Sequence, residues 1–238
     1  MKKGTILWIF AIAAIGTILV IPATRDIFTN TTNNHPYIMG FVKFAILATM
    51  GEFLASRLLF GKWVMIKGLI PKMVIWGVLG ILIVLMFSLY SSGVNGAVVK
   101  GLLFTGQGYT AKILTALYIS TIMNLTFAPV FMASHRITDV YIDKIYSGEK
   151  SSFSDVINEI DWSRFIKFVV GKTIPLFWIP AHTITFLLPD EFKVIFAASL
   201  SIFLGLILSI SRHRKERQLI LNLGLNRSYT CRGGRDEI

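Results

Sequence analysis

The sequence is poor in cysteine, in acidic residues and in charge of either sign. Of 238 residues, one is Cys, 13 are Asp or Glu, and 16% are charged, whereas soluble globular chains average roughly 25% charged residues. The single Cys231 excludes an intramolecular disulfide. The low charge, together with 54% hydrophobic residues, excludes a disordered chain and an ordinary cytosolic enzyme.

Long hydrophobic runs dominate the chain instead, and mean hydropathy is +0.65. A bilayer core about 30 Å thick needs roughly 20 apolar residues per helix. We therefore expect an all-α, polytopic transmembrane bundle of about six hydrophobic helices. The segments that approach the required length are 5–21, 37–60, 73–90, 113–133, 165–188 and 194–211.

Basic residues are distributed unevenly between the loops that join these segments. If all six segments span, loops on one side hold far more Lys and Arg than loops on the other, which predicts that both termini are cytoplasmic. The asymmetry also accounts for much of the net charge of +11 without nucleic acid as a partner. The richer side has Lys2, Lys3, Arg57, Lys62, Lys67, Lys72, Arg136, Lys144, Lys150, Arg164, Lys167, Arg212, Arg214, Lys215 and Arg217, and the other has Arg25, Lys100, Lys112 and Lys193.

The two ends of the chain differ in character from its middle. Residues 1–22 fit an uncleaved signal-anchor helix, because no Ala-x-Ala site follows the apolar run. We expect one transmembrane domain over 1–214, followed by a basic cytoplasmic tail at 215–238. Arg212, Arg214, Lys215 and Arg217 are candidate ligands for anionic lipid, although anchoring of the last helix explains them equally well.

The longest polar stretch, 134–163, lies between the fourth and fifth segments. Within it Phe153, Val156, Ile157 and Ile160 repeat at helical spacing, after a serine suited to an N-cap. The pattern predicts a short amphipathic helix. It lies either on the inner membrane surface or packed against the bundle.

Glu52 falls near the middle of the second segment, where a charge costs roughly 3 kcal/mol on insertion scales. It should therefore face the bundle or water. Small neighbours, among them Gly51, allow another helix to approach closely at that face. Glu52 is either part of a polar path or gate, or a hydrogen-bonding partner between helices.

The fourth and fifth segments combine polar side chains with prolines. Thr121 and Asn124 are candidates for either interhelical hydrogen bonds or pore lining. Trp178, His182 and Thr185 recur at i, i+4 and i+7, so they share a helix face that either lines a hydrated cavity or is satisfied by neighbouring helices. The prolines expected to kink these helices, by removing backbone hydrogen bonds, are Pro129, Pro175, Pro180 and Pro189.

The sixth segment presents small residues four apart, a ribbon that favours close helix packing without indicating a function. Its members are Ala197, Ser201, Gly205 and Ser209. The partner helix belongs either to this chain or to a second copy, so a homo-oligomer is open. The four His and one Cys do not cluster, and no nucleophile–base pair has a local signature, so we expect no metal, no cofactor and no enzymatic activity.

Several short motifs, taken in order, resemble those of one family. They are His35-Pro36-Tyr37, Gly51-Glu52, Asn124 with Phe127-Ala128-Pro129, Trp178-Ile179-Pro180-Ala181 up to Pro189, and Phe192-Lys193-Val194-Ile195-Phe196-Ala197. The arrangement over 35–214 resembles the family of the twenty-two-kilodalton peroxisomal membrane protein and its mitochondrial relative, Mpv-seventeen. Met123 and Thr185 stand where that family has Asp and Asn, which suggests a distant, bacterial branch.

The resemblance implies a small multi-helix membrane protein without catalytic activity, in this case of a bacterial cytoplasmic membrane. Some family members look like weakly selective pores for small solutes. We therefore expect a channel-like protein whose path is faced by Glu52, Asn124, His182 and Thr185. The alternative is a structural or stress-related assembly protein, in which the same groups hold helices together.

Overall fold

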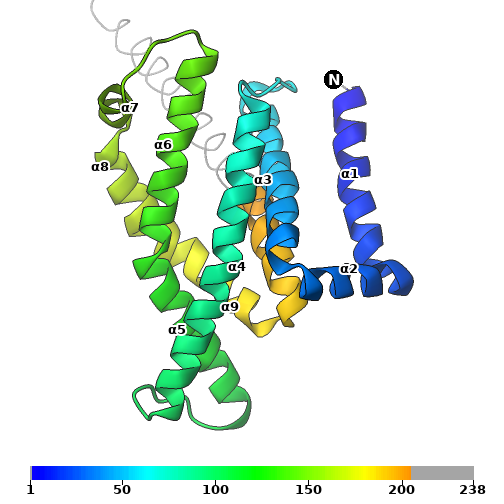
Figure 1. Ribbon diagram of the computed structural model, residues 1–238, viewed down its shortest axis with the longest axis vertical. Coiled ribbons are helices and arrows are strands. Elements are labelled where there is room, and N and C mark those ends of the chain that lie inside the picture. The colour runs from blue at the N-terminus through cyan, green and yellow to red at the C-terminus, as the bar shows by residue number, and fades with distance from the viewer. Residues whose placement is uncertain (1, 205–238) are drawn as a thin grey trace, which may run out of the picture.

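The computed structural model describes residues 2–204, and this part of the chain is helical between its turns (Figure 1). The all-α prediction is therefore confirmed for these residues. A last helix begins at residue 190 and continues to residue 204. The preceding elements are α1 (Lys2–Val20), α2 (Pro22–Asn34), α3 (Pro36–Phe60), α4 (Leu69–Val99), α5 (Gly108–Thr126), α6 (Ala128–Tyr146), α7 (Phe153–Glu159), α8 (Trp162–Arg164), the π-helix η1 (Phe165–Trp178) and α9 (Ile179–Leu187).

Three helices within residues 2–204 are long and apolar enough to cross a membrane, namely α1, α3 and α4. α5 and α6 add a fourth candidate if they are taken as one bent span. The 31 residues of α4 extend about 46 Å, so α4 is longer than the predicted segment 73–90 and exceeds the bilayer core. The molecule is thus a helical protein with three to four candidate spans, whereas six remains a prediction.

The fourth predicted segment, 113–133, is divided between two helices, with the break two residues before Pro129, one of the prolines at which a kink was expected. α5 ends at Thr126, α6 begins at Ala128, and the two helices are bent by 46° relative to each other. Pro129 lies in the first turn of α6, where its missing N–H would have had no intrahelical partner. α6 then runs on to Tyr146, so the first part of the polar stretch 134–163 is helix.

The fifth predicted segment, 165–188, is divided into two helices of different geometry. Pro175 lies inside the π-helix η1, and Pro180 lies in the first turn of α9. Pro189 follows the end of α9 and precedes the last helix. Neither η1, with 14 residues, nor α9, with nine, is long enough alone to count among the candidate spans.

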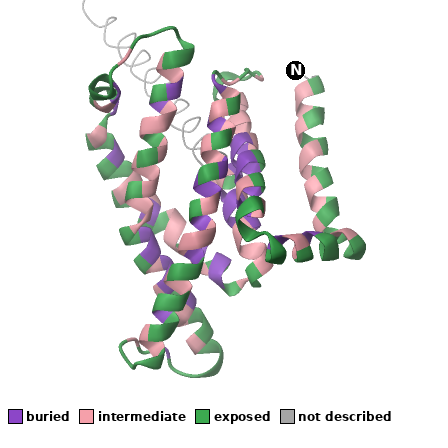
Figure 2. Cartoon of the chain, viewed as in Figure 1, coloured by how far each residue is buried: buried purple, intermediate pink, exposed green. Residues whose placement is uncertain are grey.

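α3 and α4 form the closest helix pair of the bundle. A Cβ atom on Gly40 would lie 2.9 Å from the carbonyl oxygen of Gly80, so only glycine permits this backbone approach. Buried side chains gather along these two helices and where α5 and α9 meet them (Figure 2). The core there includes Phe44, Leu47, Ile83, Phe87, Ile119, Met123, Phe186 and Ile195.

The small-residue ribbon of the last helix packs against α3 of the same chain. A Cβ atom on Gly51 would lie 2.9 Å from Ser201 Oγ, which itself donates a 3.4 Å hydrogen bond to the carbonyl of Leu47. Ala197, one turn earlier, is buried. The other candidates of this region lie outside the described residues, namely Gly205, Ser209, Arg212, Arg214, Lys215, Arg217 and the tail 215–238.

α1 and α2 form an L-shaped arm at the edge of the bundle (Figure 1). α2 was not expected from the sequence. It covers Lys43, whose Nζ donates to Thr32 Oγ1 at 2.9 Å and lies 4.4 Å from the Phe28 ring centroid. α1 contains no fully buried residue among those described (Figure 2). Two indole hydrogen bonds attach α1 to the bundle. Trp8 Nε1 donates to Met50 O, and Trp63 Nε1 donates to Thr5 Oγ1.

α7 is the short amphipathic helix expected around 153–160. Ser152 is its N-cap and exchanges hydrogen bonds with Asp155 in a capping box, and these bonds hold the pKa of the Asp155 carboxyl below its ordinary value. Val156 is fully buried against Val140 of α6, which agrees with packing on the bundle. Phe153 remains exposed.

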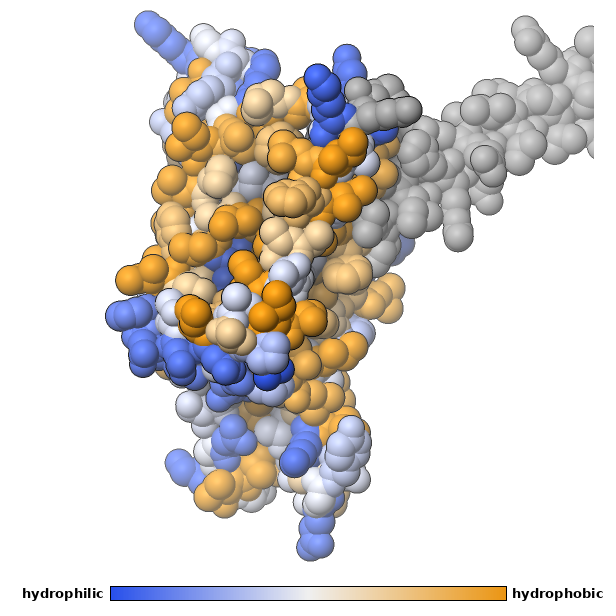
Figure 3. Space-filling view, turned by 90° about the vertical axis from the view of Figure 1, so that its right-hand side faces the viewer, coloured by the Kyte–Doolittle hydropathy of each residue, from blue (hydrophilic) through white to orange (hydrophobic). Residues whose placement is uncertain are grey.

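Hydrophobic and hydrophilic side chains are partly segregated on the surface. The face in Figure 3 is hydrophobic over much of its upper half, with hydrophilic side chains above this region and in a band below it, and its lower end is mixed. The N-terminal end of α1, the α3–α4 turn and the α6–α7 connection lie at one end, and the α4–α5 connection lies at the other (Figure 1). Loops that the Lys and Arg distribution assigns to one side thus lie at one end of the described bundle, and the orientation in a membrane stays a prediction.

Candidate functional site

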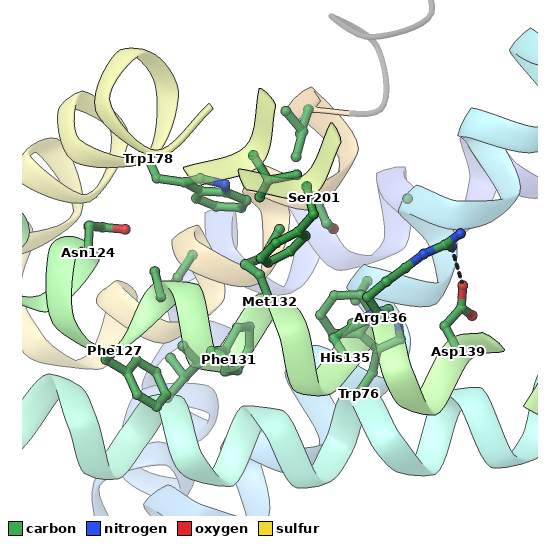
Figure 4. A pocket seen from close by; sticks show the side chains of 18 of the residues that line it. Trp76, Asn124, Phe127, Phe131, Met132, His135, Arg136, Asp139, Trp178 and Ser201 are labelled. Atoms are coloured by element: carbon green, nitrogen blue, oxygen red, sulfur yellow. Dashed lines mark ion pairs between the residues drawn. The ribbon is translucent and has the colours of Figure 1, made fainter. Parts of the chain in front are cut away.

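A cavity of about 560 Å³ lies between α3, α4, α5, α6, η1 and the last helix. Most of its lining is apolar or aromatic, and a row of polar side chains lies along one side (Figure 4). Arg136 and Arg164 mark its exposed end, whereas the buried side chains of Met123, Asn124 and His182 close the other. The cavity is thus a pocket that opens toward one end of the bundle.

Glu52 reaches this pocket from the middle of α3. Its Oε1 accepts a 2.6 Å hydrogen bond from Trp76 Nε1 on α4 and lies 3.9 Å from His135 Nε2 on α6. The side chain is 26% exposed. Glu52 is therefore hydrogen-bonded to α4 and lies close to α6, an arrangement that fits both roles predicted for it, a polar path and an interhelical hydrogen bond.

A row of charged groups on α6 continues from Glu52 toward the open end. His135, Asp139 and Asp143 are four residues apart, so they share one face of the helix. Lys72 of α4 pairs with both carboxylates, at 2.6 Å to Asp139 Oδ1 and 2.9 Å to Asp143 Oδ1. Arg136 adds a weaker contact, 3.6 Å from Asp139 Oδ2 (Figure 4).

This row was missed in the sequence because 134–163 was interpreted as a polar connection between segments. The i, i+4, i+8 spacing of one His and two Asp was the available signal. Trp76 was also missed, since an aromatic residue inside an apolar run has many explanations.

The closed end of the pocket is a hydrogen-bonded cluster between α5 and α9. Asn124 Nδ2 donates to the carbonyl of Ser120 at 2.8 Å and lies 3.0 Å from His182 Nδ1. Ser120 Oγ in turn donates to the carbonyl of Ile179, at 2.7 Å. Ser120 and Asn124 are fully buried and His182 nearly so. Ser120, rather than the predicted Thr121, is thus the polar partner of Asn124 on the buried stripe of α5.

The predicted face of Trp178, His182 and Thr185 is divided in its roles. Trp178 and His182 both line the pocket, with ring centroids 5.3 Å apart. Thr185 is fully buried, donates to the carbonyl of Ala181 at 2.9 Å, and is not part of the lining. Thr121 is half-buried and also lies outside the lining.

Two polar atoms at the pocket are buried without a hydrogen-bond partner among the described residues. They are Trp178 Nε1 and His135 Nε2. Buried donors of this kind cost free energy unless a partner is supplied. The wall of the pocket therefore has free hydrogen-bonding capacity at both its deep and its open part.

Comparison of the chain with family models, curated proteins and solved structures finds no match. Within residues 2–204, no group of three or more His, Cys, Asp or Glu side chains is arranged to hold a metal ion. The pocket is therefore interpreted from its own geometry.

Proposed function

We propose that the chain is a non-catalytic, channel-like membrane protein, with a weakly selective path for small solutes or ions that includes the pocket at Glu52. The observation that supports this most directly is that a carboxylate within α3 lines a cavity of about 560 Å³ whose lining also includes the exposed Arg136 and Arg164. Ionisable groups within membrane helices are costly, and those that face a cavity commonly mark a solute or ion path.

Glu52 is accompanied in the pocket by the ionisable side chains of His135 and Asp139 on α6. The side chains of Glu52, His135 and Asp139 are 26%, 19% and 21% exposed. Lys72 and Asp143 lie outside the lining, where Lys72 pairs with both Asp139 and Asp143. A solute in the pocket therefore meets several ionisable side chains rather than a single isolated carboxylate.

The buried cluster of Ser120, Asn124 and His182 closes the path at its other end. Because its hydrogen bonds join α5 to α9, an open path requires these two helices to separate or rotate there. The break between α5 and α6 at Phe127 and the change of helix type at Trp178 lie directly beside this closure. Both are places where a helix direction can change without disrupting a continuous helix.

Current across a planar bilayer tests this proposal. We expect discrete openings from the purified protein, with altered conductance or ion preference in Glu52→Gln. Asp26→Asn, which removes one carboxylate from exposed α2, is the matched control and should behave as the wild type. If all three proteins insert and fold but give no current, the channel function is refuted.

The second candidate is a structural or assembly protein, and the closed cluster itself favours it. Ser120 donates to the carbonyl of Ile179, and Asn124 lies 3.0 Å from His182 Nδ1, so both residues join α5 to α9, as groups that hold helices together would. If the bilayer assay gives no current and Asn124 proves to stabilise the fold, the structural or assembly role is the better assignment.

We further propose that the chain is a distant, bacterial member of the Mpv-seventeen family, with both termini cytoplasmic. The placement of the shared motifs supports this. Pro36 opens α3, Ala128-Pro129 opens α6, and Pro180 lies in the first turn of α9, so three of the motifs mark helix starts.

A further inference from the structure

We infer that the pocket at Glu52 binds a hydrophobic organic cation, an amine or quaternary onium with apolar substituents. This deepens the proposed function, since it rests on solutes entering that pocket, and it names their chemical class. The ligand's charge lies at Glu52, and its apolar body lies among the aromatic side chains of the lining.

The charge balance around Glu52 is the first observation behind this inference. Among residues 2–204, no Lys or Arg forms an ion pair with its carboxylate, and the nearest basic atom is His135 Nε2, at 3.9 Å. Asp139, another carboxylate of the pocket lining, is instead paired with the buried Lys72 and the exposed Arg136. An ionised group largely withdrawn from water needs a counter-charge. A bound cation supplies the counter-charge that Glu52 lacks.

The lining provides the second observation. Aromatic faces attract cations, most strongly where water is excluded, and they also bury apolar substituents. A volume of about 560 Å³ falls in the range of pockets that enclose drug-sized molecules. The aromatic residues of the lining, apart from the two histidines, are Phe44, Trp76, Phe127, Phe131, Phe165, Phe168 and Trp178.

An inorganic cation is a poorer fit to the same surroundings. Such ions need several oxygen ligands at once, and within the described part of the chain no cluster of acidic or His side chains is arranged to provide them. An apolar wall cannot replace the water that the ion would lose. A cation whose charge is surrounded by apolar substituents does not incur this cost of losing water.

Two arginines at the pocket have to be weighed against a cationic ligand. Arg136 is 53% exposed and contacts Asp139, and Arg164 is exposed at the mouth. Exposed charges are hydrated and screened, so they need no counter-ion from a ligand. Glu52, deeper and less hydrated, gains more from one. An anion would instead bind at the arginines, and the experiment distinguishes the two outcomes.

The test measures binding of two ligands of nearly the same shape and opposite charge, tetraphenylphosphonium and tetraphenylborate. The full chain is studied in lipid nanodiscs by isothermal titration calorimetry, with empty nanodiscs subtracted. We expect saturable binding of the phosphonium, at least tenfold weaker in Glu52→Gln and unchanged in Asp26→Asn. Phe131→Leu, which keeps an apolar side chain and removes one ring, should weaken binding several-fold.

Each contrary outcome overturns the inference. These are equal phosphonium affinity in wild type and Glu52→Gln, tighter binding of the borate, or no saturable phosphonium binding by the folded protein. If Glu52→Gln fails to fold, the comparison of the two ligands and Phe131→Leu still decides. Bilayer currents without phosphonium binding would leave the channel function standing alone, whereas binding without currents would leave a ligand-binding membrane protein.

Discussion

Replacing Asn124 by Ala removes the side chain that joins α5 to α9 at the closed end of the pocket. Asn124 is fully buried, donates to Ser120 O at 2.8 Å, and lies 3.0 Å from His182 Nδ1. In the variant, the buried Nδ1 of His182 loses this partner. The change therefore tests whether the cluster holds the bundle together.

The expected loss is about 2 kcal/mol in the free energy of unfolding. A buried polar group left without a partner costs roughly 1–3 kcal/mol. Hydrogen bonds between membrane helices average about 0.6 kcal/mol, with a maximum near 1.7. His182 is buried, with 7% of its surface exposed. We therefore expect an interaction energy of about 1 kcal/mol between Asn124 and His182.

The assay is a double-mutant cycle of Asn124→Ala and His182→Ala, with reversible unfolding in mixed micelles followed by circular dichroism. Thr31→Ala combined with His182→Ala is the control, because Thr31 Oγ1 bonds within α2, to Ile27 O. The control pair should be additive within about 0.5 kcal/mol. An equally additive result for Asn124 and His182 would refute the assignment of this cluster as a link between α5 and α9.

Three further changes test other contacts. Gly51→Ala should destabilise the protein by about 1–3 kcal/mol through overpacking. Gly93→Ala is the control and should not, because a Cβ atom there meets nothing within 4 Å. Equal melting temperatures of the two variants would contradict the close helix contact at Gly51. Ser152→Ala should speed hydrogen exchange in α7, with about 1 kcal/mol of cap stabilisation lost. In the wild type, α7 should lose protection as pH falls below the ordinary pKa of Asp155, because the folded carboxyl has the lower pKa. Lys72→Met should cost about 1–3 kcal/mol in chemical unfolding, because Asp143 loses this ion pair and Asp139 keeps only the 3.6 Å contact with Arg136. Lys72→Arg should restore most of the loss.

The sequence was sufficient to predict where hydrophobic helices lie and which small residues bring them together. The length of the apolar runs identifies α1, α3 and α4, because a bilayer requires that length. Gly51 and Ser201 were each predicted to lie at a close helix contact, but the spacing of small residues did not reveal that they face each other. Such local signals depend on one segment at a time.

The pocket depends on which segments meet, and this is where prediction from sequence was incomplete. Glu52 was identified as costly in a membrane, but its partners Trp76 and His135 lie on two other helices. Because α6 runs from Ala128 to Tyr146, Asp139 belongs to a helix of the bundle rather than to the supposed polar loop. Pairing between distant helices is a tertiary property, so no periodicity within one segment reveals it.

The attachment of α1 has a consequence for the order in which the protein is assembled. Its indole contacts are made with the backbone of Met50 on α3 and with Trp63 in the α3–α4 turn. Both partners leave the ribosome after α1 does. α1 is therefore synthesised before the residues that attach it to the bundle, and its indole contacts form only once α3 and the α3–α4 turn are in place. Until then its apolar surface, which stays largely exposed in the folded protein, has no partner from either of them.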